Sequence, residues 1–315
     1  MGHLLAKIDS IVRISGGVLL NTPSVDAIED IKISSSKINR GDLFIDVNSS
    51  KEEIEIAVQN GAYCIITELI PEISDEEIAW ISVENLEKSL IKLTRFYAIT
   101  KKYRFISLSS VQYALLKSLH LEERVKLLSN YTPEALMQIL KSEEKTLFFI
   151  IKNSFLESID PTIKKADEKI EPDKIFENGL FNSSFIYKDK FVKDIRLSSF
   201  FVPYLCSLIK QLDDLEIKYT IDNFKQFEHF YPQFVTSKLE KSDFGSTRKV
   251  IIFEKDATLY KDELGYLYER VDKTIIVDDI EKLKSVNFRY ALINAKKEDL
   301  DEFLKEKKTM QLELF

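Results

Sequence analysis

The stretch of residues 33–68 constrains the fold more than any other part of the sequence, because apolar segments alternate there with a helical pattern. An apolar segment at 43–47 is followed by a helical pattern at 51–59. Gly61 ends this pattern, since glycine supplies the left-handed backbone that closes a helix. A second apolar segment follows at 63–67. The order of strand, helix and strand predicts an α/β domain.

The same alternation extends over residues 1–102. Apolar residues at helical spacing predict one helix near the N-terminus, which Gly16-Gly17 ends, and a second helix after the last predicted strand. The positions that mark the two helices are Leu4, Leu5, Ile8, Ile11 and Val12, then Leu86, Leu90, Leu93 and Tyr97. Further strands are expected at 18–20, 31–33 and 80–83. We therefore expect residues 1–102 to form a small α/β domain.

Composition narrows the class of protein. A length of 315 residues allows more than one core, and we expect two domains. The chain is 44% hydrophobic and 31% charged, which is typical of a folded protein. Its 45 basic residues are outnumbered by 52 acidic ones, giving a net charge of −7. That balance argues against direct nucleic-acid binding, because lysine and arginine must neutralise the phosphates.

The cysteines and histidines form no recognisable metal or disulfide pattern. Cys64 and Cys206 stand in apolar segments without C-x-x-C spacing, so we interpret them as buried thiols. The three histidines lack the spacing of zinc ligands. The sequence shows no secretory signal pattern and no apolar run of membrane-spanning length. We expect a cytoplasmic protein without membrane contact.

Two short motifs carry a family resemblance. Gly41-Asp42-Leu43-Phe44 precedes Gly61-Ala62 at a fixed distance, and a strand at 80–83 follows. In this order they resemble the N-terminal, UDP-binding domain of the Mur ligases, ATP-dependent bacterial enzymes that add amino acids to UDP-linked muropeptides. The resemblance covers about residues 1–102. It implies a role in peptidoglycan biosynthesis, with the first domain retained.

The resemblance also places a candidate ligand site. The family's D-S-R motif aligns with Ser34, Ser35 and Ser36, of which only Ser35 matches, and Lys37 is the nearest cation. The family's second uridine-binding loop is shortened here to residues 48–53. Two interpretations stay open. Ser34 to Ser36 and Lys37 bind the UDP moiety of a ligand, or they form a solvated strand end.

The phosphate loop of the family is missing. In Mur ligases a strand leads into T-G-[ST]-x-G-K-T, whose glycines let backbone N–H groups wrap the ATP phosphates. Here the strand and helix expected at 103–117 contain no glycine, and none occurs between Gly61 and Gly179. Most other residues do not adopt the required backbone angles, and their side chains would occupy the space of the nucleotide. We therefore predict a degenerate central α/β domain over residues 103–315 that does not bind ATP.

The rest of this larger domain reads as α/β, with a helix from Thr132, an apolar helix at 200–212, and strands at 146–152, 250–253, 274–277 and 290–293. The aromatic residues between 224 and 234 favour core packing or a partner surface. The remaining length leaves no room for the family's third domain. The turn formed by Gly245, Ser246, Thr247 and Arg248 could hold an anion on its backbone amides and Arg248, but we favour the interpretation as a plain turn.

The last residues contain a second resemblance. Gln311, Leu312, Leu314 and Phe315, in the order Q-L-E-L-F, resemble the peptide by which bacterial replication and repair proteins dock on the DNA sliding clamp. A glutamine amide would form hydrogen bonds while leucine and phenylalanine fill apolar pockets. Packing of this tail on its own domain is the competing interpretation.

Together these patterns predict a non-catalytic relative of the Mur ligases. We find no catalytic cluster, no metal ligands and no cofactor site in the sequence. The leading hypothesis is binding of a UDP-linked muropeptide precursor, of a protein of the peptidoglycan pathway, or of both. The alternatives are an enzyme that acts on a UDP-linked substrate without ATP, and an adaptor that binds the sliding clamp.

Overall fold

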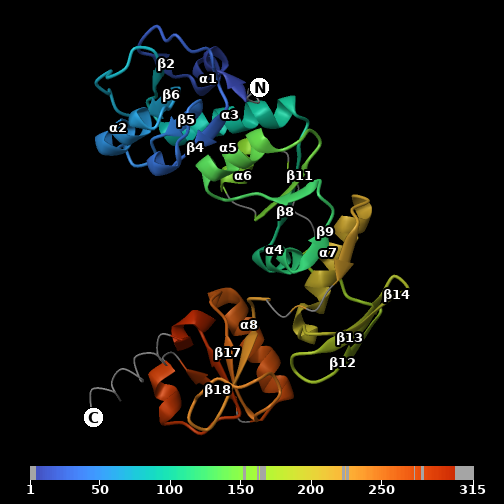
Figure 1. Cartoon of the computed structure of the whole chain (residues 1–315). Helices are drawn as coiled ribbons and strands as arrows, with labels where there is room; N and C mark the ends of the chain where they lie inside the picture. Colours follow the sequence, from blue (N-terminus) through green and yellow to red (C-terminus); the bar gives the residue numbers. More distant parts are fainter. Residues whose placement is uncertain are drawn as a thin grey trace, which may run out of the picture. The chain divides into compact units, whose positions relative to one another are not determined.

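The computed structural model describes residues 5–151, 154–161, 163, 168–221, 224, 227–272, 274–277 and 280–301. The chain divides into two compact units (Figure 1). Unit 1 comprises Met1–Ser109 and Glu122–Ala166, and unit 2 comprises Ser110–Leu121 and Asp167–Phe315. The domain division at residues 102 and 103 stays a prediction.

Unit 1 begins with a five-stranded sheet. Its strands are β2 (Val18–Leu19), β7 (Ala79–Ser82), β6 (Cys64–Thr67), β5 (Asp42–Ile45) and β4 (Asp30–Lys32), in that spatial order. Strands β4 to β7 are mutually parallel, and β2 is antiparallel to β7. A separate two-stranded sheet consists of β1 (Ala6–Lys7) and β3 (Ala27–Ile28), which are antiparallel.

Both faces of this sheet are covered by helices. Leu43 and Ile45 belong to a core that includes residues of α1 (Ile8–Ser15) and α3 (Leu86–Thr100). Phe44 points to the opposite core, with residues of α2 (Lys51–Gln59). The alternation of side chains along a strand explains this division. Strands buried on both faces read as continuous apolar runs, which is why the sequence reveals them.

A second, three-stranded parallel sheet completes unit 1. Its spatial order is β10 (Val125–Leu127), β11 (Leu147–Ile151) and β8 (Arg104–Leu108). Helices α5 (Thr132–Lys141) and α6 (Ser154–Ile159) belong to this part. Leu136 and Leu140 on one side of α5 pack into the core that contains α1 and α3. Ala135 and Ile139 on another side pack into the core of the three-stranded sheet. Helix α5 therefore joins the two sheets.

Unit 2 contains smaller sheets and two long helices. Helix α4 (Ser110–Lys117) contacts α7 (Val202–Asp214), and β9 (Leu119–Leu121) pairs with β15 (Tyr219–Ile221). Strands β12 (Lys174–Glu177), β13 (Ser183–Tyr187) and β14 (Lys190–Ile195) form an antiparallel meander. The short helix η2 (Ser199–Phe201) leads directly into α7.

The sequence did not reveal the meander. Its second hairpin turns at Lys188 and Asp189, which have φ angles of 48° and 62°. Two successive left-handed residues form the two-residue turn that suits a hairpin, and this turn usually contains Asn-Gly or Asp-Gly. Because neither position is glycine, the usual sequence signal for the hairpin is absent.

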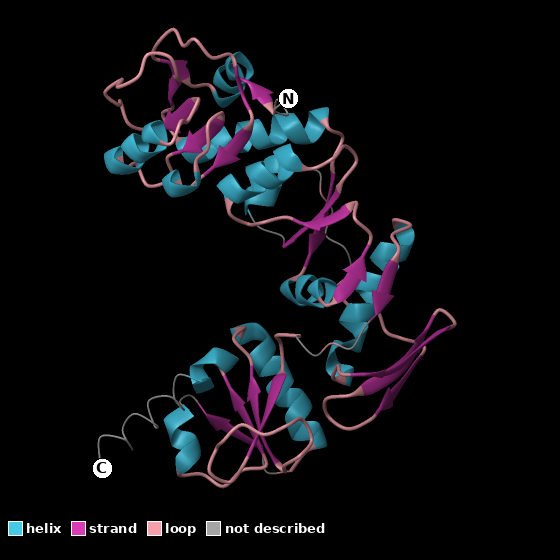
Figure 2. Ribbon diagram, in the orientation of Figure 1, coloured by secondary structure: helices cyan, strands magenta, loops and turns pink. Residues whose placement is uncertain are grey.

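Unit 2 ends with a four-stranded sheet in the order β16 (Tyr231–Val235), β17 (Lys249–Phe253), β19 (Tyr290–Ile293) and β18 (Thr274–Val277). Strands β17, β18 and β19 are parallel, and β16 is antiparallel to β17. Helix α8 (Ala257–Arg270) connects β17 to β18, and η3 (Ile280–Lys284) connects β18 to β19 (Figure 2). This sheet has its own core, which includes Ile251, Phe253 and Ile293.

The structure confirms the α/β class that the sequence predicts, including the strand and helix at 103–117, which are β8 and α4. The predicted N-terminal helix begins at Ile8, and the predicted helical position Leu4 lies outside the described residues. Among the helices described, none combines the length and apolar character that crossing a bilayer requires.

The carboxyl edge of the first sheet depends on a buried polar pair, which gives a stability prediction. Thr67 donates a hydrogen bond from Oγ1 to Asp46 Oδ2 at 2.7 Å and accepts one from the Leu69 N–H. Both side chains are buried. The substitution Thr67→Val keeps the shape but leaves these groups unpaired, so we expect a loss of about 1–3 kcal/mol in the free energy of unfolding.

Urea denaturation followed by circular dichroism measures this loss. Thr100→Val is the matched control, because Thr100 is exposed near the end of α3. We expect its effect to stay within about 0.5 kcal/mol. Equal midpoints for the two variants would show that the Asp46–Thr67 pair does not stabilise the sheet edge.

Candidate functional site

The candidate UDP-binding residues pack beside helix α2, near its C-terminal end. Ser34 lies two residues after the end of β4, and residues Ser35–Lys37 form the short helix η1 before β5. Ser35 is buried, and its carbonyl accepts a hydrogen bond from the Asn60 side chain at 3.0 Å. Ser36 and Lys37 are exposed. Ser34 is half-buried, and its Oγ forms a hydrogen bond with Ser36 Oγ at 3.1 Å. The structure therefore leaves Ser34, Ser36 and Lys37 as the parts of the predicted site that a ligand can reach.

A pocket of about 370 Å³ lies at the carboxyl edge of the first sheet, beyond β5 and β6, and none of the predicted UDP-binding residues lines it. The pocket is lined by the segments that follow β5 and β6, by the start of α3, and by the segment that leads into α5. Its lining residues are Val47, Ser49, Glu68, Leu86, Glu87, Leu90, Asn130, Tyr131, Thr132 and Pro133. The carboxyl edge of parallel strands is the usual place for a ligand in an open α/β sheet.

Two helices begin at this pocket, α3 at Leu86 and α5 at Thr132. The first N–H of α3 already donates to Glu68 Oε1, at 2.6 Å. Tyr131, which precedes α5, makes no side-chain capping bond to that helix. Free N–H groups at a helix start attract anions. The pocket thus offers carboxylates on the α3 side, and hydroxyl and N–H donors on the α5 side.

The segment in place of the phosphate loop is very short. Strand β8 ends at Leu108 and helix α4 begins at Ser110, so Ser109 alone connects them. A phosphate loop requires several residues, glycines among them, between its strand and helix. Ser109 cannot supply the row of backbone N–H groups that would surround a triphosphate.

In the second predicted anion site, residues 245–248, polar groups form hydrogen bonds within the turn itself. Gly245 has a φ angle of 78°, and the Ser246 N–H donates to the Asp243 carbonyl at 3.0 Å. Ser246 Oγ donates to the same carbonyl, and Thr247 Oγ1 donates to the Lys249 carbonyl. Arg248 is exposed. Anion binding by this turn stays a prediction, with Arg248 as its main donor.

The predicted clamp-binding peptide lies outside the described residues, as does the polar segment before it. Gln311, Leu312, Leu314 and Phe315 therefore stay a prediction from sequence.

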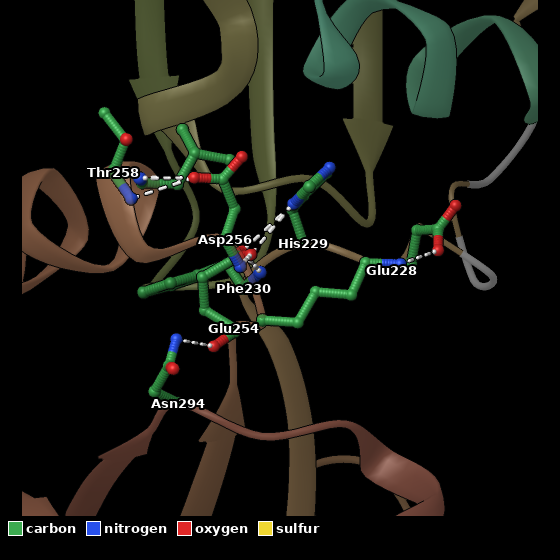
Figure 3. Close-up of polar contacts among 9 residues, drawn as sticks. Glu228, His229, Phe230, Glu254, Asp256, Thr258 and Asn294 are labelled. Carbon is green, nitrogen blue, oxygen red and sulfur yellow. Dashed lines mark hydrogen bonds and ion pairs between the residues drawn. The ribbon is translucent and has the colours of Figure 1, made fainter. Parts of the chain in front are cut away.

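Unit 2 contains a buried polar cluster that the sequence analysis missed (Figure 3). Glu254 follows β17 directly and is fully buried. Its carboxylate accepts hydrogen bonds from His229 Nδ1 at 3.1 Å, from the Phe230 N–H at 3.1 Å and from the Asp256 N–H at 2.8 Å. Its backbone carbonyl accepts a bond from the Asn294 side chain, which follows β19. Glu254 thus joins two strand ends, the start of α8 and the segment before β16.

A second buried carboxyl group, Glu263 on α8, accompanies Glu254. Burial, and after it the negative charge of Glu254, raise the pKa of Glu263 well above its usual value. Neither side-chain oxygen of Glu263 has a hydrogen-bond partner in the described part of the chain. For Glu254, burial acts in the same upward direction, but the hydrogen bond and charge of His229 lower its pKa overall. Glu263 therefore keeps its proton to a higher pH than an ordinary glutamate, whereas Glu254 loses its proton at a lower pH.

Sequence signals for this cluster were present but weak. Glu254 comes directly after an apolar strand, and Asp256 stands in the position that begins a helix, where it accepts bonds from the N–H groups of Thr258 and Leu259. Polar residues at a strand end before a helix often mark a site in α/β proteins. His229 carried no signal, because it lies among aromatic residues.

The fold resembles solved structures of Mur ligases. The chain matches the UDP-N-acetylmuramoylalanyl-D-glutamyl-2,6-diaminopimelate–D-alanyl-D-alanyl ligase of Acinetobacter baumannii with a TM-score of 0.55 and 12% identity, over 96% of this chain and 92% of that chain. A MurF structure from the same organism gives 0.58 and 12%, over 97% and 93%. MurF of Thermotoga maritima in complex with ADP gives 0.53 and 13%, over 81% and 78%.

No protein-family model and no curated protein matches the sequence. At 12–13% identity the solved structures show the fold alone, which is that of the Mur ligases. The match spans nearly the whole of both Acinetobacter chains and is not confined to the first domain. The expectation that the chain has no room for the family's third domain stays a prediction from sequence. The C-terminal sheet has a core of its own, which the sequence analysis did not distinguish within residues 103–315.

The carboxyl pair gives a prediction for the dependence of stability on pH. Folded Glu263 keeps its proton at a pH at which unfolded Glu263 has lost it, so stability falls as pH rises above about 4.5. Glu263→Gln removes this titration and keeps a neutral side chain of similar size. We expect its advantage over the wild type to grow by about 1.4 kcal/mol per pH unit until the folded Glu263 ionises.

Urea midpoints between pH 5 and pH 9 test this expectation. Glu269→Gln on the same helix is the control, since the side chain of Glu269 is 77% exposed. The control should follow the wild type at every pH. A constant difference between Glu263→Gln and the wild type across the range would contradict the neutral state of Glu263.

Proposed function

We propose that this protein binds a UDP-linked muropeptide precursor in unit 1 and does not use ATP. In this proposal it is a non-catalytic, Mur-ligase-like protein of the bacterial cytoplasm. A protein of the peptidoglycan pathway is its proposed second partner. The ligand would occupy the pocket at the carboxyl edge of the first sheet, beside the segment that leads into α5, and would extend to Lys37.

The observation that carries the proposal is the connection between β8 and α4. Ser109 alone links the strand and the helix, and no glycine occurs between Gly61 and Gly179. Acyl-phosphate chemistry requires a bound triphosphate, and the family binds it by backbone N–H groups at this position. A chain that keeps the fold without this loop is suited to binding and not to ligation.

The pocket chemistry supports the ligand class. A uracil ring and a ribose present N–H and hydroxyl donors, which match the carboxylates of Glu68 and Glu87 in the pocket lining. A diphosphate presents only acceptors, which match the Ser49 and Thr132 hydroxyls and the start of α5. Lys37 on η1 is exposed and is the cation proposed to reach a phosphate group, from outside the pocket lining.

Calorimetric titration tests this function directly. We expect UDP-N-acetylmuramoyl-tripeptide to bind with measurable heat and Mg-ATP to give none, because the chain lacks the phosphate loop. UDP-N-acetylglucosamine is the comparison ligand, since it shares the nucleotide but lacks the peptide. Tight binding of Mg-ATP would overturn the proposal, and so would the absence of binding by both UDP compounds.

A substitution locates the ligand. Lys37→Ala should weaken precursor binding about tenfold, because a charge-assisted bond to phosphate is lost. Lys7→Ala is the matched control, since Lys7 is also exposed in unit 1 but lies on β1. Both variants should unfold at the wild-type urea concentration. Equal affinities for the two variants would remove Lys37 from the site.

A further inference from the structure

Unit 2 contains a pocket whose walls are mainly aromatic. Its volume is about 230 Å³, and it lies where the segment after β14 meets the segments before and after β16. The phenylalanines that line it are Phe181, Phe201, Phe224, Phe227, Phe230, Phe234 and Phe244. Phe181 contacts Phe230 and Phe234 with ring centroids 5.7 and 6.1 Å apart. Such walls suit a flat ring, which gains edge-to-face contacts with its neighbours.

The mouth of this pocket carries a guanidinium group. Arg196 follows β14, is half-buried, and lies with Cζ 4.0 Å from the ring centroid of Phe244. Within the described part of the chain, no carboxylate forms an ion pair with Arg196. Guanidinium binds carboxylate and phosphate groups with two parallel hydrogen bonds, and stacking on an aromatic ring holds it in place. The mouth is therefore suited to an anion.

His229 supplies an oriented polar group in the same pocket. It is 5% exposed, and its ring lies beside Phe201 and Phe227, with centroid distances of 6.4 and 5.5 Å. Its Nδ1 donates to Glu254, so Nε2 is the nitrogen left for a ligand, and Figure 3 shows it pointing away from that carboxylate. A buried carboxylate on one imidazole nitrogen fixes the direction in which the other points.

The size of the pocket limits the ligand. Pockets for drug-sized molecules measure about 300–1,000 Å³, and this one is smaller. One aromatic ring with one acidic substituent fits such a volume. The ring would contact the phenylalanines, the acid group would reach Arg196, and a ring substituent would reach His229.

We propose that this pocket binds a small aromatic anion, namely a single ring that carries a carboxylate or a phosphate. The site belongs to unit 2 and is separate from the precursor pocket of unit 1. Its existence would give the protein a second ligand, independent of the function proposed above. It would also explain why the chain buries the Glu254–Glu263 pair, whose charge orients His229.

Fluorine NMR of the full chain tests the site, with 4-fluorobenzoate and 4-fluorophenyl phosphate as probes. We expect at least one of them to bind about tenfold more tightly than 4-fluorobenzamide, because the amide lacks the charge that pairs with Arg196. The probe that binds more tightly identifies the acid group. Binding of neither anion, or equal binding of the amide, would overturn the proposal.

Variants distinguish binding in this pocket from binding elsewhere on the protein. Arg196→Gln should reduce the affinity for the anion about tenfold, whereas Arg95→Gln, at an exposed position on α3, should leave it unchanged. His229→Gln should weaken binding of a probe with a ring hydroxyl, 3-fluoro-4-hydroxybenzoate, more than that of 4-fluorobenzoate. Because His229→Gln risks unfolding, Arg196→Gln alone decides the assignment. Unchanged affinity in Arg196→Gln would overturn it.

Discussion

Parallel pairing of strands is the constraint on which both candidate sites depend. Strands β4, β5, β6 and β7 run in one direction, so the chain leaves all four at the same edge of the sheet. The polar residues that follow them must gather there, where N–H groups of the next helices also begin. The same rule places Glu254 after β17 and Asn294 after β19 at one edge of the C-terminal sheet.

The two edges use their polar residues differently. At the first edge Asp46 and Thr67 satisfy each other, and the groups beyond them line an open pocket. At the second edge Glu254 is saturated by three donors, and an uncompensated carboxyl group, Glu263, is buried beside it. Burial of an extra carboxyl group opposes folding unless the group stays neutral. Such an arrangement is more common in a functional site than in a core.

Much of the fold could be predicted because its strands are buried on both faces and separated by recognisable turns. The predicted strands at 63–67 and 250–253 and the predicted helix at 51–59 correspond closely to β6, β17 and α2. The meander could not be predicted, because Lys188 and Asp189 form its hairpin turn without glycine. The polar residues of the C-terminal cluster were also missed. Glu254 and His229 are 25 residues apart in sequence, and no local pattern joins them.

The sequence by itself determined the order of strands and helices and the absence of a glycine-rich phosphate loop, because both depend on residues adjacent in the chain. Only the tertiary structure decided which side chains meet. It buried Ser35, left Lys37 exposed, and placed Arg196 on the ring of Phe244. It also set the protonation of Glu263, since the burial and the neighbouring charge that raise its pKa arise from contacts between distant segments.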